Sequence, residues 1–391
     1  MEIREAVAEA KNNRPPEKKM KIAVVTLPLH TNYGGILQAY ALQKVLAPAG
    51  HEVVVVRFRD RAAYRLTHSL SVFLKQRGIV PYSHNYPLSA KEHSIIRQHM
   101  EKFIDKHIRR TPLLPGSGVA GYGFGAFVVG SDQVWRHYDS RYFLGFLREG
   151  DPAKKISYAA SFGIDRWPFT EAQTEEAGKL AARFDAVSVR EDSAVEMCAA
   201  HLGIKAELVL DPTLLLEKEE YLALLRESGV TTETPEPISD TENVFSYILD
   251  SSPSKEEIIN RAAGLLGAGV NSIVPPVMPG RRVDIEKCVW PPVERWLQGF
   301  ACAKFVVTDS FHGTALSILF NKPFIAVCND YRGAARFHSL LRMFHFEDRL
   351  VPHGEIPGDK LFTEKIDFGK VNEILAAQRR KSLDFLESAL K

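Results

Sequence analysis

Hydrophobic and polar positions follow one another along the chain in a repeating order. A short apolar run, 21–27, stops at a glycine-containing loop, 28–35, and leads into an amphipathic stretch, 36–49, before the valine-rich run 52–58. Short apolar runs bounded by loops predict buried strands, and the amphipathic stretch between them predicts a helix. The opening of the chain is therefore a βαβ unit, which implies a parallel sheet.

Two further series of such elements follow. The first series has short β-rich runs at 126–130, 156–160, 186–189 and 207–210, each ending in a polar or glycine-containing loop. The second series has expected strands at 244–249, 270–274, 305–308 and 323–327, with helices at 255–266, 293–302 and 314–320. Between residues 60 and 122 the pattern predicts only a helix at 91–107.

A change of composition separates the two series. Thr, Glu, Pro and Ser crowd together at 229–243 without apolar periodicity, as is typical of a linker. Two arrays of alternating strands and helices predict an α/β protein with two Rossmann-like domains that face each other across a cleft. The expected divisions are a charged tail (1–20), an N-terminal domain (21–235), a C-terminal domain (236–370) and a C-terminal helix (371–391).

Composition narrows the class of protein. A chain of 391 residues with 45% hydrophobic content can fill two cores. Lys and Arg number 50 against 48 Asp and Glu, so local clusters of charge must attract any anionic ligand, and nucleic acid is not a favoured partner. The four cysteines are far apart, which predicts neither a zinc site nor a disulfide framework and favours a reducing cytosol.

Membrane and secretion signals are not evident in the sequence. The charged stretch 1–21 lacks the apolar core of a secretory signal, and no later segment reaches about 18 uninterrupted apolar residues. We therefore expect a soluble cytoplasmic protein. Such an enzyme can still act on a lipid-linked substrate at the inner membrane face, although the sequence does not indicate membrane association.

Ligands of open parallel sheets bind beyond the carboxyl ends of the strands, so the loops there are the first candidates for chemistry. The first loop and the helix after it offer glycines that let backbone approach a ligand and free N–H groups that suit an anion. Its candidate residues, for an acceptor or for the cleft loop, are Asn32, Tyr33, Gly34, Gly35 and Gln38. A tight strand-to-helix turn is the equally weighted alternative.

Two more loops follow strands of the first series. Asp132, Gln133 and Trp135 come after 126–130, a composition that can hold a sugar, although Ser131 and Asp132 also suit helix caps and aromatic residues there more often pack. Arg190 follows 186–189 directly. It is either a bidentate anion clamp or a partner of the neighbouring Glu191 or Asp192.

The loop 308–313 concentrates the most reactive side chains. It places Asp309, Ser310 and His312 between a strand and a helix expected to start near Gly313, and its hydroxyls and N–H groups would suit a phosphate. Downstream, Arg332 and Arg336 are four residues apart, as on one helical face. A solvated basic face is the simpler interpretation of these two arginines alone.

Six phrases, in this order, resemble the polysaccharide pyruvyl transferase family over residues 21–345. They are Asn32-Tyr-Gly-Gly35 with Leu37-Gln-Ala-Tyr-Ala-Leu42, Val128-Val-Gly-Ser-Asp-Gln-Val-Trp135, Tyr158-Ala-Ala-Ser-Phe-Gly163, Ser188-Val-Arg-Glu-Asp192, Asp211-Pro-Thr213 and Thr308-Asp-Ser-Phe-His-Gly313. No single phrase is decisive, but six in order are hard to obtain by chance. The resemblance implies a fold similar to the GT-B glycosyltransferase architecture.

The resemblance also implies a reaction. Phosphoenolpyruvate would transfer its pyruvyl group to a sugar of a bacterial cell-surface polysaccharide or its precursor, free or lipid-linked, commonly as a cyclic ketal, with no metal or organic cofactor. It implies that His312 is the acid or stabilises departing phosphate, and that Arg190 binds the donor. Asp132 and Asp309 are candidate bases from their loop positions, and Ser310, Gly313, Arg332 and Arg336 lie on the donor side.

The chain departs from the family pattern at Ser310, because many members carry Arg two residues before the equivalent of His312. Either Arg332 or Arg336 replaces that charge, or the donor differs. A glycosyltransferase with a nucleotide-sugar donor is the competing enzyme, and a non-catalytic carbohydrate-binding protein is the competing class. Close approach of Arg190 and His312 at one open pocket would argue against loss of the donor site.

Overall fold

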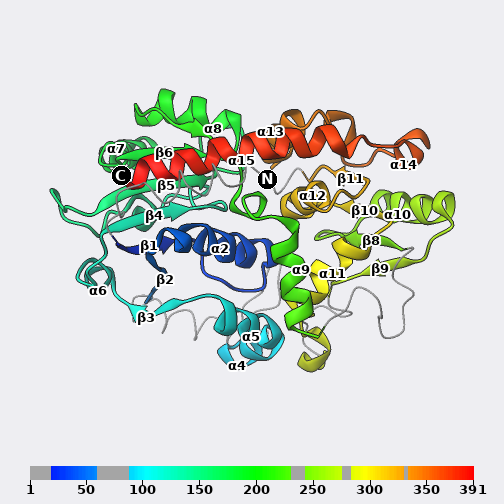
Figure 1. Ribbon diagram of the computed structural model, residues 1–391, viewed down its shortest axis with the longest axis horizontal. Helices are drawn as coiled ribbons and strands as arrows, with labels where there is room; N and C mark the ends of the chain where they lie inside the picture. The colour runs from blue at the N-terminus through cyan, green and yellow to red at the C-terminus, as the bar shows by residue number, and fades with distance from the viewer. Residues whose placement is uncertain (1–18, 60–87, 230–242, 275–282, 330–332) are drawn as a thin grey trace, which may run out of the picture.

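The computed structural model describes residues 19–59, 88–229, 243–274, 283–329 and 333–391. Within them the strands form two sheets, one of seven strands in the order β3-β2-β1-β4-β5-β6-β7 and one of five in the order β12-β11-β10-β8-β9. Every pairing in both sheets is parallel. The expected α/β class with two Rossmann-like domains is confirmed (Figure 1).

The N-terminal sheet is built from short apolar segments. Its strands are β1 (Lys21–Val25), β2 (Glu52–Phe58), β3 (Arg110–Leu114), β4 (Ala126–Gly130), β5 (Lys154–Ala160), β6 (Ala186–Val189) and β7 (Glu207–Leu208). Its helices are α2 (Tyr33–Leu46), α4 (Ala90–Ile96), α5 (Gln98–His107), α6 (Gly116–Ala120), α7 (Glu171–Ala181), α8 (Asp192–Met197) and α9 (Lys218–Glu227). β4 is buried at every position, because helices cover both faces of a parallel sheet.

The C-terminal sheet follows the same plan. Its strands are β8 (Val244–Tyr247), β9 (Val270–Ser272), β10 (Phe305–Thr308), β11 (Phe324–Val327) and β12 (Leu350–Val351). Its helices are α10 (Pro253–Leu266), α11 (Val293–Cys302), α12 (Phe311–Leu319), α13 (Ala335–Met343) and α14 (Lys360–Thr363), and α15 (Phe368–Leu390) ends the chain. The expected linker lies mostly outside the described residues, and the domain limits given above stay a prediction.

Several helices begin or end at residues other than those predicted from the sequence. The first helix starts at Tyr33, three residues earlier than predicted, because the Asn32 side chain caps it by accepting from the Gly35 N–H. The helix predicted at 91–107 is divided at Arg97 into α4 and α5. β3 and α7 were not predicted, and α12 starts at Phe311, so His312 lies in its first turn and not before it.

Both sheets have a switch point, where the chain order reverses and ligands of such sheets bind. In the N-terminal sheet it lies between β1 and β4, and in the C-terminal sheet between β8 and β10. The loop with Asn32 follows β1 and the loop with Asp132 follows β4, and their side chains are joined by a hydrogen bond of 3.2 Å. The loop with Asp309 follows β10. Three of the candidate loops therefore lie at switch points.

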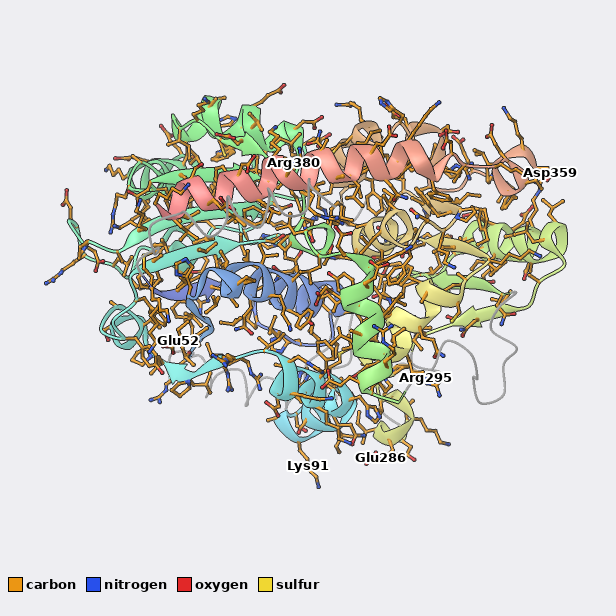
Figure 2. The ribbon with its side chains drawn as sticks, in the orientation of Figure 1. Glu52, Lys91, Glu286, Arg295, Asp359 and Arg380 are labelled. Carbon is orange, nitrogen blue, oxygen red and sulfur yellow. The ribbon has the colours of Figure 1, made fainter. Side chains whose placement is uncertain are left out.

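One hydrophobic core runs through both domains. Tyr33, at the start of α2, stacks on Trp296 of α11 with ring centroids 5.1 Å apart, and its hydroxyl donates to the carbonyl oxygen of Pro291 at 2.6 Å. A second contact joins α4 to the short turn 285–288, and Figure 2 shows Lys91 and Glu286 of these two elements at the same end of the molecule.

The terminal helix α15 returns to the N-terminal domain. Figure 1 shows this helix, in red, crossing from the C-terminal sheet over to the N-terminal sheet. Ser382 accepts a hydrogen bond from the Leu210 N–H at 3.0 Å, and Arg379 donates to the carbonyl oxygens of Leu214 and Leu216 at 2.9 and 3.0 Å. α15 therefore secures the loop that follows β7, which carries Asp211.

Candidate active site

Asp211 lies at the centre of a buried polar cluster where the domains meet. Its Oδ1 accepts from the N–H and the hydroxyl of Thr213 at 3.0 and 2.8 Å. Its Oδ2 accepts from the hydroxyl of Ser131 at 2.9 Å and from Nη1 of Arg190 at 2.7 Å. The ends of β4, β6 and β7 are therefore joined through one carboxylate.

His312 approaches the same carboxylate from the C-terminal domain. Its Nε2 lies 3.6 Å from Oδ2 of Asp211, which is an ion-pair distance. The Nδ1 side of the ring packs on the first turn of α2, where a methyl group added to Gly34 would overlap the imidazole. Glycine is required at this position because the backbone of one domain touches a side chain of the other.

Arg190 connects Asp211 to the switch point of the N-terminal sheet. Its Nη2 donates to Oδ1 of Asp132 at 3.3 Å, and Oδ2 of Asp132 accepts from Asn32. Asp132 has a φ of 63°, in the left-handed region where non-glycine residues are uncommon and often functional. The hydrogen bonds of Arg190 therefore go to these two aspartates, and not to the neighbouring Glu191. We name Asp132, Arg190, Asp211 and His312 the Asp211 cluster.

Phe311 carries two guanidinium groups from different elements. The Cζ atoms of Arg190 and Arg336 lie 4.4 and 5.6 Å from the centre of its ring, within the range of cation–π contact. Burial, together with the positive charge of Arg190, lowers the pKa of Arg336 to about 9. Arg332 lies outside the described residues, so the expectation that it shares a helical face with Arg336 stays a prediction.

Three polar atoms at this junction are buried without a hydrogen-bond partner among the described residues. They are Nε of Arg190, Oε2 of Glu191 and Nε2 of His312. Buried polar atoms in folded proteins are almost always paired, so atoms left over at one place need an explanation. A ligand that supplies both donors and acceptors would provide it.

Glu191 fixes a second contact between the domains. Its Oε1 accepts from the Ser161 hydroxyl and from the N–H groups of Phe162 and Gly163, at 3.0, 2.7 and 3.0 Å. A methyl group added to Gly333 of the C-terminal domain would overlap the carbonyl oxygen of Gly163. Burial raises the pKa of Glu191 despite the nearby arginines.

Asp309 belongs to a different network. Its carboxylate accepts from the N–H groups of Leu249 and Asp250 at 2.6 and 3.1 Å, from Nζ of Lys255 at 2.7 Å and from Asn329 at 3.4 Å. We name Asp250, Lys255, Asp309 and Asn329 the Lys255 cluster. Among the described residues, these hydrogen bonds tie Asp309 to the Lys255 cluster and not to the Asp211 cluster, although only two residues separate it from His312.

Ser310 and Gly313 shape the start of α12. The Ser310 side chain caps the helix by accepting from the Gly313 N–H at 3.4 Å. A methyl group added to Gly313 would overlap Oγ1 of Thr308, so glycine allows the helix to pack closely on β10. Both residues thus orient His312, while a role in binding the donor stays a prediction.

The remaining candidates of the first two loops are mostly buried. Tyr33 packs between domains, and burial raises its pKa above the usual range. Gln38 donates to Thr26 and to the Gly35 carbonyl at 3.0 and 2.9 Å. Trp135 has an exposed fraction of 0% and stacks on Phe143, which fits the packing interpretation of its aromatic ring.

Gln133 is half-buried and lines a cavity of about 530 Å³ in the N-terminal domain. Neither Arg190 nor His312 lines that cavity, and their exposed fractions are 4% and 5%. Of the two features expected of an intact donor site, close approach of Arg190 and His312 is present, and an open pocket at these residues is not. The residues approach each other closely through Asp211, but they are not open to solvent in this structure.

Asp211 was not among the residues singled out from the loops, although its Asp-Pro-Thr phrase belongs to the resemblance. The available signal was its position directly after the apolar run 207–210. Burial alone would raise its pKa, but His312, Arg190 and the Thr213 N–H together hold the pKa of Asp211 well below its usual range. The carboxylate is therefore a stable anion that can orient the imidazole of His312.

No group of three or more His, Cys, Asp or Glu side chains among the described residues could hold a metal ion. In the same part of the chain, no helix has the length and apolar content to cross a membrane.

Several solved structures are similar to this chain over most of its length. A UDP-N-acetylglucosamine 2-epimerase from Rickettsia bellii is 12% identical, with 95% of this chain and 97% of that chain covered and a TM-score of 0.44. A UDP-GlcNAc 2-epimerase from Methanocaldococcus jannaschii is 10% identical, with coverage of 91% and 92% and a TM-score of 0.46. A heptosyltransferase from E. coli is 14% identical, with coverage of 92% and 100% and a TM-score of 0.38. No curated protein matches the sequence.

The fold and the site define a two-domain protein of the Rossmann-like class in which ionisable side chains of both domains meet. The model of one family, described as polysaccharide pyruvyl transferase, matches residues 32–331, which is most of the chain. The chain belongs to the polysaccharide pyruvyl transferase family, as its six phrases indicated. The family is one of transferases that act on polysaccharides.

Proposed function

We propose that this protein is a cytoplasmic enzyme that transfers the pyruvyl group of phosphoenolpyruvate to a saccharide and forms a cyclic ketal. The observation that carries the proposal is the convergence of Arg190 and His312, from different domains, on one carboxylate oxygen of Asp211 at 2.7 and 3.6 Å. In a member of this family, that arrangement supplies a fixed cation beside a group able to donate a proton.

The donor is a small compound with two anionic ends, a phosphate and a carboxylate. Arg190 uses one N–H of each terminal nitrogen on aspartates and keeps its Nε donor without a partner among the described residues. Arg336 lies against the same phenylalanine ring. We infer that Arg336 supplies the charge that Ser310 lacks, so that one arginine binds each end of phosphoenolpyruvate.

The reaction needs two proton transfers that balance. One sugar hydroxyl attacks the central carbon of the enol and gives up its proton to a base, while the methylene carbon of the enol gains a proton from an acid and becomes a methyl group. A second hydroxyl then displaces phosphate from the same carbon and loses its proton, which leaves a ketal and inorganic phosphate. His312, oriented by Asp211, would protonate the methylene carbon or the departing phosphate, and Asp132 would accept a hydroxyl proton.

Access to this site requires a movement of the domains. Arg190 and His312 are almost completely buried, and Gly34 and Gly333 are contact points between the domains. We infer that phosphoenolpyruvate enters when these contacts separate, and that their closure excludes water from the reacting carbon. Asp309, whose carboxylate is saturated with donors, would then hold the loop that carries His312 and would not act as a base.

The test is a thermal-shift titration with phosphoenolpyruvate, uridine and guanosine nucleotides and nucleotide-sugars, followed by an assay of phosphate release in the presence of saccharides. A ligand that binds only the native state raises its apparent stability by about 2.7 kcal/mol at a hundredfold excess over its dissociation constant. Stabilisation by phosphoenolpyruvate and not by nucleotides supports the proposal. Stabilisation by a nucleotide alone would replace it with a glycosyltransferase.

A further inference from the structure

Leu210, the residue before Asp211, has both of its backbone groups bound by side chains. The ladder of the N-terminal sheet ends one residue earlier, where the Val209 N–H donates to β6 at 3.0 Å. The Leu210 carbonyl oxygen accepts from the Tyr158 hydroxyl at 2.9 Å, and its N–H donates to the Ser382 hydroxyl at 3.0 Å. Side chains therefore replace the sheet in holding the chain directly before Asp211.

The two side chains come from different elements, and both are buried. Tyr158 lies on β5 and Ser382 on α15, and each has an exposed fraction of 0%. Burial raises the pKa of Tyr158 well above its usual range, so its hydroxyl stays a donor at neutral pH. The Ser382 hydroxyl donates to the Gln378 carbonyl oxygen at 2.8 Å, which leaves its lone pairs for Leu210. Burying these hydroxyls is costly unless they make hydrogen bonds, and both make one to Leu210.

The position of the Asp211 carboxylate matters because one of its oxygens meets groups from three directions. Oδ2 accepts from Ser131 at 2.9 Å and from Arg190 at 2.7 Å, and it lies 3.6 Å from Nε2 of His312. Groups of an active site work when surrounding residues hold them within about 0.5 Å of the productive geometry. A shift of Leu210, one peptide bond away, would move the carboxylate relative to all three groups.

The chain on the other side of Asp211 has anchors of its own. The Thr213 carbonyl oxygen accepts from the Tyr221 hydroxyl at 2.9 Å, and that of Leu214 accepts from Arg379 at 2.9 Å. These anchors keep the loop docked when one hydrogen bond at Leu210 is removed. Such a removal should therefore displace the carboxylate without releasing the loop.

We propose that Tyr158 and Ser382 are positioning residues of the active site, because they hold Leu210 and so set where the Asp211 carboxylate meets His312. The inference rests on the function proposed above, in which His312, oriented by Asp211, transfers a proton. Tyr158 is the first residue of the phrase 158–163, and in this role it acts on the reaction without belonging to the Asp211 cluster.

Two variants each remove one hydrogen bond and leave the reacting groups in place. Tyr158→Phe keeps the ring and removes its hydroxyl, and Ser382→Ala removes the acceptor on α15. The controls are Tyr122→Phe, a half-buried residue at the opposite edge of the sheet, before β4, and Ser388→Ala, an exposed residue of α15. Near-UV circular dichroism confirms that each protein is folded. Tyr158→Phe keeps its packing, so it decides the outcome if Ser382→Ala does not fold.

The first measurement is the NMR signal of the His312 imidazole in the full chain with labelled histidine, identified by its absence from His312→Gln. We expect Tyr158→Phe and Ser382→Ala to shift this signal more than the controls do, because Asp211, which faces the imidazole, moves with Leu210. A loss of packing confined to β5 or α15 would not move it. A signal that stays at the wild-type position in the folded variants would overturn the inference.

The second measurement is a double-mutant cycle on the rate of pyruvyl transfer at saturating donor and acceptor. A displacement of about 1 Å can cost on the order of 10²-fold in rate, so we expect each variant to lose about 10- to 10²-fold. The same substitutions in an Asp211→Asn background should change the rate by at most about twofold, because the group that they position is already lost. Equal losses in both backgrounds would overturn the inference.

The His312 signal is recorded without donor or acceptor, so the two proposals can fail separately. A protein whose His312 signal responds to Tyr158→Phe, but which does not transfer pyruvyl groups from phosphoenolpyruvate, loses the proposed function and keeps the positioning of Asp211. A protein that transfers pyruvyl groups but whose His312 signal does not respond loses this inference and keeps the proposed function.

Discussion

The two domains each carry a buried cluster of charge at the carboxyl end of a parallel sheet, and the clusters differ in how fully their polar atoms are paired. In the Lys255 cluster, Asp309 accepts from two backbone N–H groups and from Lys255 and Asn329. In the Asp211 cluster, Nε of Arg190 and Nε2 of His312 have no hydrogen-bond partner among the described residues.

This difference separates a structural role from a functional one. A buried ion pair whose lone pairs and protons are all used holds backbone in place but has nothing left to offer a ligand. A cluster with unused donors and acceptors carries an energetic cost unless a ligand pairs them. The comparison therefore supports the proposal that the reaction takes place at Asp211, Arg190 and His312, while Asp309 fixes the loop before α12.

The largest expected effect is on activity, and it comes from the Asp211 cluster. His312→Gln should lower the rate of pyruvyl transfer by about 10² to 10⁴-fold, the usual contribution of a general acid or base. Phosphate release from phosphoenolpyruvate in the presence of acceptor measures it. His338→Gln, an exposed histidine of α13, is the control, and a fully active His312→Gln protein would break the comparison.

The Lys255 cluster should give the larger loss of stability. Lys255→Met leaves the Asp309 carboxylate buried without its cation, which typically lowers the free energy of unfolding by about 3 to 5 kcal/mol. Denaturant unfolding measures it. The control is Arg261→Gln, which breaks the exposed pair with Asp359, labelled at the edge of the molecule in Figure 2, and should cost at most about 1 kcal/mol. Equal losses in both variants would contradict the structural role.

Two buried carboxylates where the domains meet, those of Asp211 and Glu191, should make contributions to the free energy of unfolding that change with pH in opposite directions. The folded-state pKa of Asp211 is lowered, so its contribution is present above the ordinary pKa of about 3.9 and is lost as pH falls towards the folded value. In Asp211→Asn, the loss of stability should be on the order of 2 kcal/mol near pH 7 and shrink on acidification.

Glu191 provides the contrast. Its folded-state pKa is raised, so its contribution is present below about pH 4.3 and is lost as pH rises through the folded value. Glu191→Gln can keep the three hydrogen bonds to Oε1. We expect the free energy of unfolding of this variant, relative to that of wild type, to be higher at neutral pH than in acid. Unfolding midpoints measured from about pH 2 to about pH 8, a range that reaches below the ordinary pKa of Asp211 and above that of Glu191, compare the two variants. Parallel profiles would contradict the assignment.

The smallest effect tests the contact between the domains. Gly34→Ala places a methyl group on the imidazole of His312, so we expect a loss of about 1 to 3 kcal/mol in stability and a lower rate of transfer. The matched control is Gly264→Ala in α10, where nothing lies within 4 Å of the added methyl group. Alanine there should stabilise the helix by about 0.5 to 1 kcal/mol. A Gly34→Ala protein as active and stable as wild type would show that the domains do not close as described.

The sequence predicted the strands well, because a strand buried on both faces is a continuous apolar run such as 126–130. It missed β3, whose Arg-Thr-Pro-Leu-Leu sequence is short and partly exposed. Candidate residues His312, Arg190 and Asp132 could be chosen because each follows a strand; in the structure Asp211 joins His312 to Arg190, and Arg190 joins both to Asp132. The sequence could not show that Asp309 faces Lys255, since that pairing depends on the order of strands in the sheet.

The central claim is that phosphoenolpyruvate binds at the Asp211 cluster, and isothermal titration calorimetry tests it most directly. Wild type, Arg190→Gln and the surface control Arg261→Gln would be titrated with phosphoenolpyruvate after near-UV circular dichroism confirms that each is folded. The account predicts that wild type and Arg261→Gln bind equally and that Arg190→Gln binds at least about tenfold more weakly, since a charge-assisted contact is lost. Unchanged affinity in a folded Arg190→Gln protein, or no binding to wild type, would contradict it.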